Sequence, residues 1–500
     1  VAMPVVNAAG VTATSTVNFA AAGFDGGTNT ITAQSFGVGG GNNDGNNGNL
    51  AILTLGTRNT IHADTVNIGG YAAAGTVLFP AGLVSPSLTL RGTDGTSAVT
   101  TVKVGETSSG ARSGSGTLNL TGGELDARVT NLTIGRHIAG ANLADTSSVT
   151  MPAGTLVVEN LALAEKVNNG TPTLTSTFTQ EGGDVSAVTI TLGNGGPQEA
   201  RLLPTYRLWG GTLAATTIQA GGGSFAANSS RNLILRGGVL ENQPGADLAI
   251  SGITVTVAGN TTTIVGPTAG QKVTLASNVN YSARLNSAAG TSGALVVEGP
   301  LDLSAQPAFS IFDDAPGDAT LLAPGTKLKL IDYSLGTLTG TFAGLNDGAT
   351  VTVTKGAVTN TFVIDYDDLG GTAVTLTVPD TGNDYTSWAV DKGIPGEPFD
   401  GDFDHDGISN GMEYALGKDP KAPSQPAGQF SGNTITFAKG ADAIANRDVS
   451  WVIETSPTLA PESWTPEVTQ EAGDPATVIS YSFTPASPVR KFARLRVEQK

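Results

Sequence analysis

Apolar and polar residues alternate in short segments along most of this chain, and Gly, Asn, Asp or Ser separates one segment from the next. A period of two places successive side chains on opposite faces of the backbone, which is typical of short, half-buried β-strands. Five of the segments contain a Gly-Gly or Ala-Gly pair. They are TLNLTGGEL (117–125), SVTMPAGTL (148–156), TFTQEGGDV (177–185), YRLWGGTL (206–213) and NLILRGGVL (232–240).

These segments recur at a regular interval. The second glycines of the pairs are separated by 31, 29, 28 and 27 residues, and they are Gly123, Gly154, Gly183, Gly211 and Gly238. A second set of glycines ends the segments TVNIG, TVKVG, NLTIG, TITLG and TIQAG, at Gly69, Gly105, Gly135, Gly193 and Gly221. The two sets keep the same offset of ten residues at Gly183/Gly193 and at Gly211/Gly221. Two markers in phase indicate a repeat of about 29 residues.

A unit of this length with two or three short strands cannot bury its own apolar face, so it must stack on its neighbours. Glycine corners and one coil per repeat favour a parallel β-helix, also called a β-solenoid. We therefore predict an all-β fold in which residues 30–274 form on the order of eight coils, spaced by roughly 4.8 Å. The alternative is a β-sandwich or propeller, but two-residue NG or DG turns do not recur between the strand pairs.

The sequence on either side of the repeats predicts further parts. Longer strands follow the repeats, then an acidic segment, then alternating strands separated by Pro, Gly and Asp. The predicted domains are an N-terminal strand segment (1–29), the solenoid repeats (30–274), the solenoid end or cap (275–379), a calcium-binding linker with short helices (380–427) and a C-terminal β-sandwich of the fibronectin type III sort (428–500). Within the linker, a short helix is expected from Tyr385 to Ile394 with Asp384 as its N-cap.

The predicted cap carries a family resemblance. The run KLKLIDYSLGTLTGTFAGLNDGATVTV, followed by FVIDYDDLGGTAVTLTV, resembles the region that closes bacterial autotransporter-associated β-strand repeat proteins, and the upstream GGxL units are similar to the repeats of those passengers. The resemblance covers about 90 residues at the cap. It implies a secreted or surface-displayed β-solenoid whose last coil is capped.

One segment carries a specific chemical motif. The sequence from residue 402 to residue 413 fits the pattern D-x-[DN]-x-[DN]-G-x5-E. Alternate carboxylates in this pattern converge on a hard cation, a glycine allows the turn, a backbone carbonyl contributes, and the last glutamate reaches back from a helix. Oxygen ligands without Cys or clustered His select Ca²⁺. The predicted ligands are Asp402, Asp404, Asp406, Ile408 through its carbonyl, Asn410 and Glu413.

This segment also resembles the EF-hand-like and thrombospondin-type-3-like calcium loops near the C-termini of large secreted bacterial proteins. Asp400 extends the ladder of carboxylates by one step and is an alternative ligand, whereas His405 is expected to point outward. The other interpretation is a solvated acidic linker. Four carboxylates within twelve residues repel one another unless a cation lies among them, which favours the metal site. The expected role of Ca²⁺ is to stiffen the joint.

Composition narrows the class of protein. Charged residues make up 14% of the chain and Gly accounts for 67 residues, which disfavours a mainly helical fold. The net charge of −17 repels phosphate backbones, so nucleic acid is not an expected partner. No apolar run is long enough to span a membrane, and Cys is absent. The chain starts at Val1 without a signal peptide, and we expect a processed export product that is extracellular or at the cell surface.

The sequence does not predict an enzyme. Its histidines, His62, His137 and His405, are far apart, and no nucleophile elbow or P-loop is present. A polysaccharide lyase is a less favoured alternative, because acidic residues of the repeats are scattered singly. A carbohydrate-binding adhesin is the main alternative. It requires exposed aromatic residues, yet only four Trp occur and Trp209 lies within a repeat strand.

The leading hypothesis is a structural protein that forms an extracellular fibre by head-to-tail self-association. The opening segment, residues 1–22, is apolar and strand-like, and such a strand tends to pair with an exposed edge. Donated to a neighbouring copy, it would build a filament because a contact between two different surfaces propagates. The alternative is that these residues form the first coil of their own solenoid.

Overall fold

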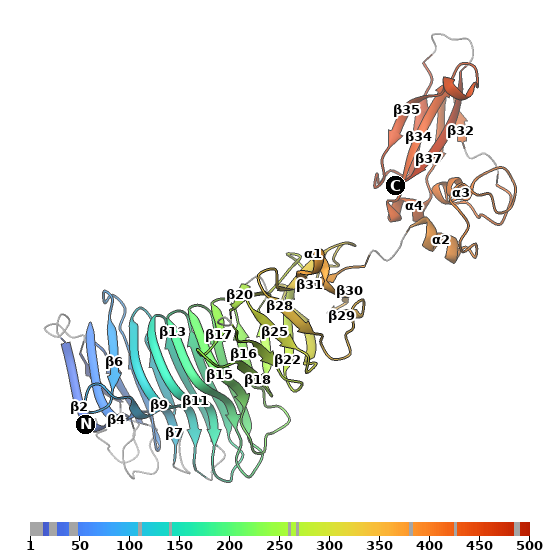
Figure 1. Cartoon of the computed structure of the whole chain (residues 1–500). Helices are drawn as coiled ribbons and strands as arrows, with labels where there is room; N and C mark the ends of the chain where they lie inside the picture. Colours follow the sequence, from blue (N-terminus) through green and yellow to red (C-terminus); the bar gives the residue numbers. More distant parts are fainter. Residues whose placement is uncertain are drawn as a thin grey trace. The chain divides into compact units, whose positions relative to one another are not determined.

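The computed structural model describes residues 14–19, 28–39, 49–108, 113–139, 143–258, 262–266, 270–379, 384–424, 428–484 and 491–500. The chain divides into two compact units, Val1–Val378 and Pro379–Lys500. The first unit is a β-solenoid of about 9 turns, and Figure 1 shows its strands stacked side by side from the blue to the yellow part of the chain. The predicted all-β solenoid is therefore confirmed.

The first face of the solenoid is one long parallel sheet. Each of its inner parallel strands pairs with the strand one turn earlier and one turn later. In spatial order the strands are β1 (Thr14–Asn18), β3 (Asn49–Thr54), β5 (Ala73–Leu78), β8 (Gly116–Asn119), β10 (Ala144–Met151), β12 (Thr173–Gln180), β14 (Arg201–Leu208), β16 (Asn232–Leu235), β19 (Thr254–Val257), β22 (Asn280–Asn286) and β26 (Ala308–Asp313), with β23 (Thr291–Ser292) antiparallel to β22.

The second and third faces are formed by long strands that cross a corner. The long strands are β2 (Thr28–Val38), β4 (Arg58–Ile68), β9 (Glu124–His137), β11 (Gly154–Lys166), β13 (Asp184–Asn194) and β15 (Thr212–Ala220). Their first halves continue into the second face through β6 (Ser87–Arg91), β17 (Val239–Asn242), β20 (Thr262–Val265), β24 (Ala294–Val297) and β27 (Lys327–Asp332). Their second halves continue into the third face through β7 (Val99–Thr107), β18 (Leu248–Ser251), β21 (Val273–Leu275), β25 (Pro300–Leu303) and β28 (Thr337–Gly340).

In-register stacking places the same kind of residue on successive turns. On the second face, one buried column of apolar side chains consists of Leu156, Val185, Leu213 and Leu240. Outside, Asn160 donates to the side chain of Asn131 one turn earlier at 3.1 Å. Ladders of like residues are favourable because apolar side chains stay in the core and polar side chains find partners on the next turn.

The repeat glycines form the corners. Gly135 has a φ of 71° and Gly193 a φ of 69°, in the left-handed region that glycine enters without steric cost. Between these two turns the same corner is occupied by Ala164, at a φ of 57°. The second glycine set therefore lacks a member between Gly135 and Gly193 because alanine forms that corner. The neighbouring turns hold Ala164 in the strained conformation.

Parallel pairing continues past residue 274, the predicted end of the repeats. β22 pairs with β26, β24 with β27 and β25 with β28, all parallel, as far as Gly340. The boundary was predicted too early because the glycine markers stop while the backbone pairing goes on. Antiparallel strands then follow: β29 (Thr350–Lys355), β30 (Val358–Asp367), the short turn α1 (Asp368–Gly371) and β31 (Ala373–Thr377). That they act as a cap stays a prediction.

The N-terminal segment is described only in part. β1 pairs in parallel with β3, which makes residues 14–18 the edge strand of this chain's own first face. For these residues the structure agrees with the first-coil interpretation. Residues 1–13 and 20–22, the rest of the suggested donor segment, lie outside the described residues.

In its described residues, the second unit contains two three-stranded antiparallel sheets and three short helices. One sheet has the order β32 (Gly428–Ser431), β33 (Thr434–Ala438), β36 (Val478–Ser482), and the other has the order β35 (Thr465–Gln470), β34 (Val449–Ser456), β37 (Phe492–Gln499). The helices are α2 (Tyr385–Asp391), α3 (Asn410–Leu416) and α4 (Ala441–Asn446), with a 3₁₀ turn at Pro461–Ser463. The fibronectin type III topology stays a prediction.

The acidic segment that we predicted as a linker belongs to the core of this unit. Trp388 of α2 packs on Tyr414 of α3 with ring centroids 5.1 Å apart, and Trp451 of β34 donates from Nε1 to the Ala415 carbonyl at 3.0 Å. Asp448 accepts from the Tyr385 backbone and from the Tyr414 hydroxyl, both at 2.7 Å. The aromatic side chains of this segment therefore pack it against the sheets, which its charge pattern alone does not indicate. As predicted, Asp384 caps α2 by accepting from Ser387 N at 2.9 Å.

Candidate metal centre

The acidic loop between α2 and α3 is shaped by its own carboxylates. Asp402 accepts from Gly407 N at 2.8 Å and Asp406 accepts from Ile408 N at 2.8 Å, so side-chain oxygens replace backbone carbonyls in the turns. Gly407 has a φ of 91° and His405 a φ of 62°. Ser409 then caps α3 by accepting from Met412 N at 3.3 Å. These local bonds curl the loop around its acidic side chains.

The curl brings the three predicted aspartates together. One carboxylate oxygen from each of Asp402, Asp404 and Asp406 lies within 4.8 Å of the others. All three side chains are half-buried, whereas His405 between them is exposed, as expected. Like charges at this separation repel, and a cation bound among them would offset the repulsion.

Glu413 on α3 is buried close enough to the three aspartates to feel their charges, although it is not one of the grouped carboxylates. Its side chain is 0% exposed; Oε1 accepts from the Ser424 hydroxyl at 2.9 Å, and Oε2 has no partner among the described residues. Burial raises the pKa of Glu413 to about 7, and the negative charges of Asp404 and Asp406 contribute to the rise. Asp404 Oδ2 is likewise buried without a described partner. Buried, unpaired carboxylate oxygens are costly and indicate a missing positive partner.

The donor set suits a hard cation. Three carboxylate oxygens converge in the loop, and such a group could hold a metal ion; that the ion is Ca²⁺ stays a prediction. Asp402, Asp404, Asp406 and Glu413 would hold the ion, with the Ile408 carbonyl as a further ligand. Bound there, the ion would neutralise the buried carboxylates and fix the start of α3.

Two residues of the loop differ from the sequence-based expectation or were missed by it. Asn410, predicted as a ligand, accepts from Phe403 N and donates to the Pro398 carbonyl, each at 3.1 Å, so its contacts hold the loop together. Ser424 donates from its backbone to Asp406 and from its hydroxyl to Glu413. The motif spacing could not predict Ser424, because this residue lies eleven positions after Glu413 and contacts it only in the folded unit.

A second group of three aspartates lies at the end of the solenoid. Asp347, Asp365 and Asp367 also bring carboxylate oxygens within 4.8 Å of one another, but Asp347 and Asp367 are exposed. Burial and the neighbouring Asp347 raise the pKa of Asp365. Asp347 accepts from Tyr366 N at 2.9 Å, so it also stabilises the strand end. Exposed carboxylates hydrated by water need no ion, so this group is a weaker candidate than the loop.

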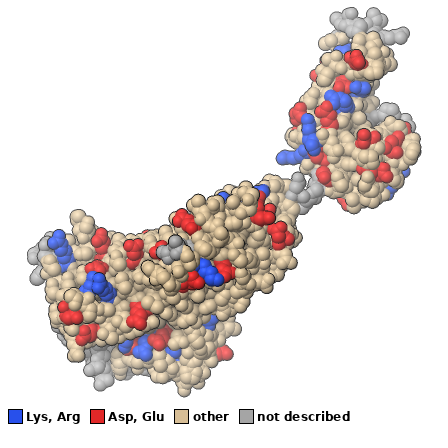
Figure 2. Space-filling view, in the orientation of Figure 1, with Lys and Arg blue, Asp and Glu red and all other residues tan. Residues whose placement is uncertain are grey.

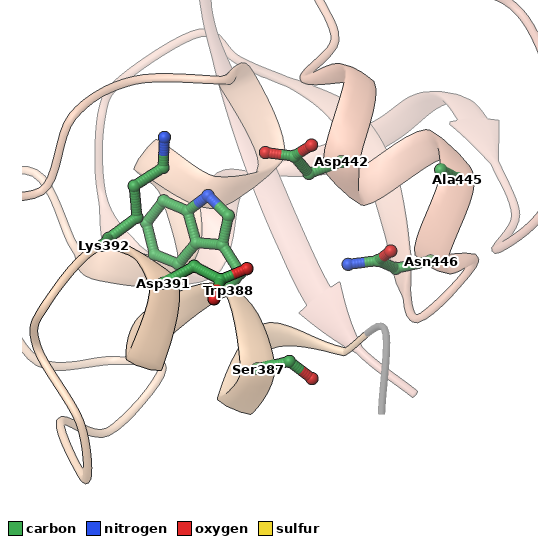
Figure 3. A pocket seen from close by; sticks show the side chains of 7 residues that line it. All are labelled: Ser387, Trp388, Asp391, Lys392, Asp442, Ala445 and Asn446. Carbon is green, nitrogen blue, oxygen red and sulfur yellow. The ribbon is translucent and has the colours of Figure 1, made fainter. Parts of the chain in front are cut away.

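A hollow of about 280 Å³ lies between α2 and α4. Figure 3 shows the Trp388 indole between Lys392 and the α4 residues Asp442 and Asn446. Ser387, the hydroxyl in its lining, donates to Asp384 at 3.0 Å and so serves the helix cap. This arrangement lacks the base next to a nucleophile that acyl transfer requires.

Inside the solenoid, polar side chains are stacked where apolar ones would be expected. Thr107, His137 and Lys166 occupy the same position on successive turns, and His137 and Lys166 are 0% and 1% exposed. Asp145, 4% exposed, lies 3.9 Å from His137 Nε2. The two ring nitrogens of His137 and the ammonium group of Lys166 have no hydrogen-bond partner among the described residues. Buried polar side chains without hydrogen-bond partners lower the stability of the solenoid core around them.

We predict that His137 makes the solenoid sensitive to acid. Burial lowers the pKa of His137, and the Lys166 charge lowers it further, against the opposing effect of Asp145. The unfolded chain binds a proton at this site near pH 6.5, whereas the folded chain resists it, so stability is full above that pH and falls as the pH is lowered through the folded value. Circular dichroism melts should show this loss for the native chain and a flatter profile for His137→Leu. His62→Asn, on an outer face, should keep the native profile.

Comparison with protein-family models, with curated proteins and with solved structures finds no match. The structure itself shows that the first unit is a β-solenoid. The resemblance to autotransporter-associated repeats stays a prediction. Among the described residues, no helix combines the length and the apolar character needed to cross a bilayer.

Proposed function

We propose that this protein is an extracellular structural protein, the subunit of a fibre that forms by head-to-tail self-association, and that Ca²⁺ stabilises its second unit. The observation that carries the proposal is the regular stacking of the first unit. Gly183, Gly211 and Gly238 lie one above another, and a Cβ on any of them would come within 2.6 Å of the backbone of the turn before. Backbones packed this closely suit a rigid rod.

The surface of the solenoid supports a structural role. Figure 2 shows its visible face as mostly uncharged, with single basic and acidic residues scattered across it. Charged groups that face each other on neighbouring turns are paired, as in Arg136 with Glu106 and Glu165 at 2.7 and 2.8 Å. Charges that neutralise each other between turns reinforce the stack.

The second unit offers a docking site for another copy. A hollow of about 610 Å³ is lined mainly by apolar side chains, among them Met412, Leu416, Ile435 and Phe437, and Phe430 at its edge is 65% exposed. Residues 1–13, VAMPVVNAAGVTA, carry no charged side chain and supply apolar residues of matching character. Insertion of this segment into the hollow of the next copy would join two different surfaces, and such a contact propagates into a filament.

The calcium loop forms part of the same hollow. Gly407, Ile408 and Ser409 of the loop and Met412 of α3 contribute to its lining. An ion bound by the neighbouring carboxylates would fix this wall, because metal binding and folding of a loop are coupled. We therefore expect assembly to require Ca²⁺.

The test is assembly of the full chain in millimolar Ca²⁺, followed by light scattering and electron microscopy. The native chain should form filaments. Deletion of residues 1–13, which leaves β1 in place, should give folded monomers, and so should Phe430→Asp. Leu459→Asp is the matched control, because Leu459 is 54% exposed and does not line the hollow. It should assemble like the native chain.

Two results would reject this proposal. Filaments of native length from the deleted chain would exclude the N-terminal segment as the connecting element. A native chain that stays monomeric at high concentration, with and without chelator, would exclude a fibre.

A further inference from the structure

A row of aromatic and arginine side chains crosses the first face of the solenoid. Leu208, Leu235, Val257, Ala283 and Ile311 are in register on five successive turns, so the residue after each of them shares one position along the face. These following residues are Trp209, Arg236, Ala258, Arg284 and Phe312. Backbone bonds from Arg236 N to the Leu208 carbonyl and from Ala258 N to the Leu235 carbonyl, at 2.8 and 2.9 Å, extend the ladder to this position.

The aromatic rings at the two ends of the row are accessible. Trp209 follows the end of β14 and is 38% exposed, and Phe312 is 48% exposed. The Arg236 and Arg207 guanidinium groups lie 5.6 and 5.7 Å from the centre of the Trp209 ring, and the Arg284 guanidinium lies 4.5 Å from that of Phe312. Trp209 is thus a surface residue one position past the end of β14, the repeat strand in which it was predicted to lie. Cation–π contacts of this kind hold the arginines beside the rings.

A hollow of about 490 Å³ lies in the middle of the row. Ala258, the small residue at the centre, leaves space between the longer side chains of the neighbouring turns. Arg207, Trp209 and Arg236 line one side of this hollow, and Asn286 and Asp314 line the other. We call it the Trp209 groove. It combines an aromatic wall with hydrogen-bonding groups on both sides, which is the usual make-up of a small-molecule or oligomer site.

The groove is locally positive in an acidic protein. Asp314 is paired with Arg284 at 3.2 Å, whereas no ion pair is recorded for Arg207 or Arg236 in the described part of the chain. Glu181 lies one turn before Trp209 in the same row, outside the lining of the groove. Two guanidinium groups that lack a carboxylate partner in the described part of the chain favour an anionic ligand at this place.

We propose that the Trp209 groove binds an acidic polysaccharide, one that contains uronic acid units. The turns are spaced by about 4.8 Å, a distance close to the length of one pyranose unit, so consecutive sugars can meet consecutive turns. Trp209 offers an apolar face to the C–H side of a sugar ring, while Arg207 and Arg236 bind its carboxylates. The side chains of Asn286 and Asp314, on the other side of the groove, would hydrogen-bond the hydroxyl groups of the sugar.

This proposal is independent of the fibre, since it uses only the first face of the solenoid. The test is isothermal titration calorimetry of the full chain with a galacturonic acid tetramer, and with a neutral glucose tetramer for comparison. The acidic tetramer should bind and the neutral one should not. Trp209→Ala and Arg236→Glu should each weaken binding about tenfold or more, which corresponds to about 1.4 kcal/mol. Added salt should weaken binding further.

Matched controls are present in the chain. Trp464 in the second unit also lies under an arginine, with Arg494 at 4.3 Å, and Arg58 is an exposed arginine of β4. Trp464→Ala and Arg58→Glu should bind as the native chain does. Equal binding of the neutral tetramer, loss of binding in the controls, or binding that depends on Arg236 but not on Trp209 would overturn the proposal. The last result would indicate a site for small anions only. Absence of any binding would overturn it as well.

Discussion

Millimolar Ca²⁺ should raise the unfolding temperature of the second unit by about 10 °C, provided the ion is present at about a hundred times its dissociation constant. The physical reason is the group of carboxylates in residues 402–413, of which Glu413 and Asp404 have buried oxygens without described partners. Trp451 is 0% exposed and belongs to this unit, so tryptophan fluorescence reports on its unfolding. Melting with Ca²⁺ and with chelator measures the gain.

A single substitution should abolish the stabilisation by Ca²⁺ without destabilising the metal-free loop. Glu413→Gln keeps the shape of the side chain and removes its charge. Because burial raises the pKa of Glu413 to about 7, the neutral amide should leave the metal-free unit as stable as the native one or more so, while abolishing the gain from Ca²⁺. Asp442→Asn, an exposed acidic residue of the same unit, should keep the full gain. A gain that persists in Glu413→Gln would contradict the proposed site.

The second large effect is expected at Gly211, which lies close against the backbone of the previous turn. Gly211→Ala should destabilise the first unit by about 2–5 kcal/mol, from the cost of a left-handed backbone and from overpacking. The φ of Gly211 is 71°, and an added Cβ would lie 2.0 Å from the carbonyl oxygen of Gly183. Calorimetric melting of the full chain would show the loss in the transition of the solenoid.

Gly222 provides the matched control for this substitution. It lies on the same unit, and an added Cβ would meet nothing within 4 Å. Gly222→Ala should therefore melt like the native chain. An equal loss at both positions would mean that the glycines matter for flexibility rather than for close packing, and the explanation of the ladder would fail.

Several features of this protein follow from the sequence by itself. The corners at Gly135 and Gly193 were predicted because a left-handed backbone is a local preference of glycine. The loop from Asp402 to Glu413 was predicted because its acidic groups lie within twelve consecutive residues, so a short turn suffices to collect them. The helix capped by Asp384 was predicted for the same reason. In each case the interaction spans only a few positions of the chain.

Other features were decided by the tertiary structure alone. Trp209 and Arg236 are 27 residues apart, and His137 and Lys166 are 29 apart; they meet only because each turn returns to the same register. The corner at Ala164 and the turns after residue 274 carry no glycine marker, since the neighbouring backbones impose them. Ser424 reaches Glu413 through the packing of the second unit. Local preference sets the repeat and the loop, whereas stacking register decides which distant side chains share a surface.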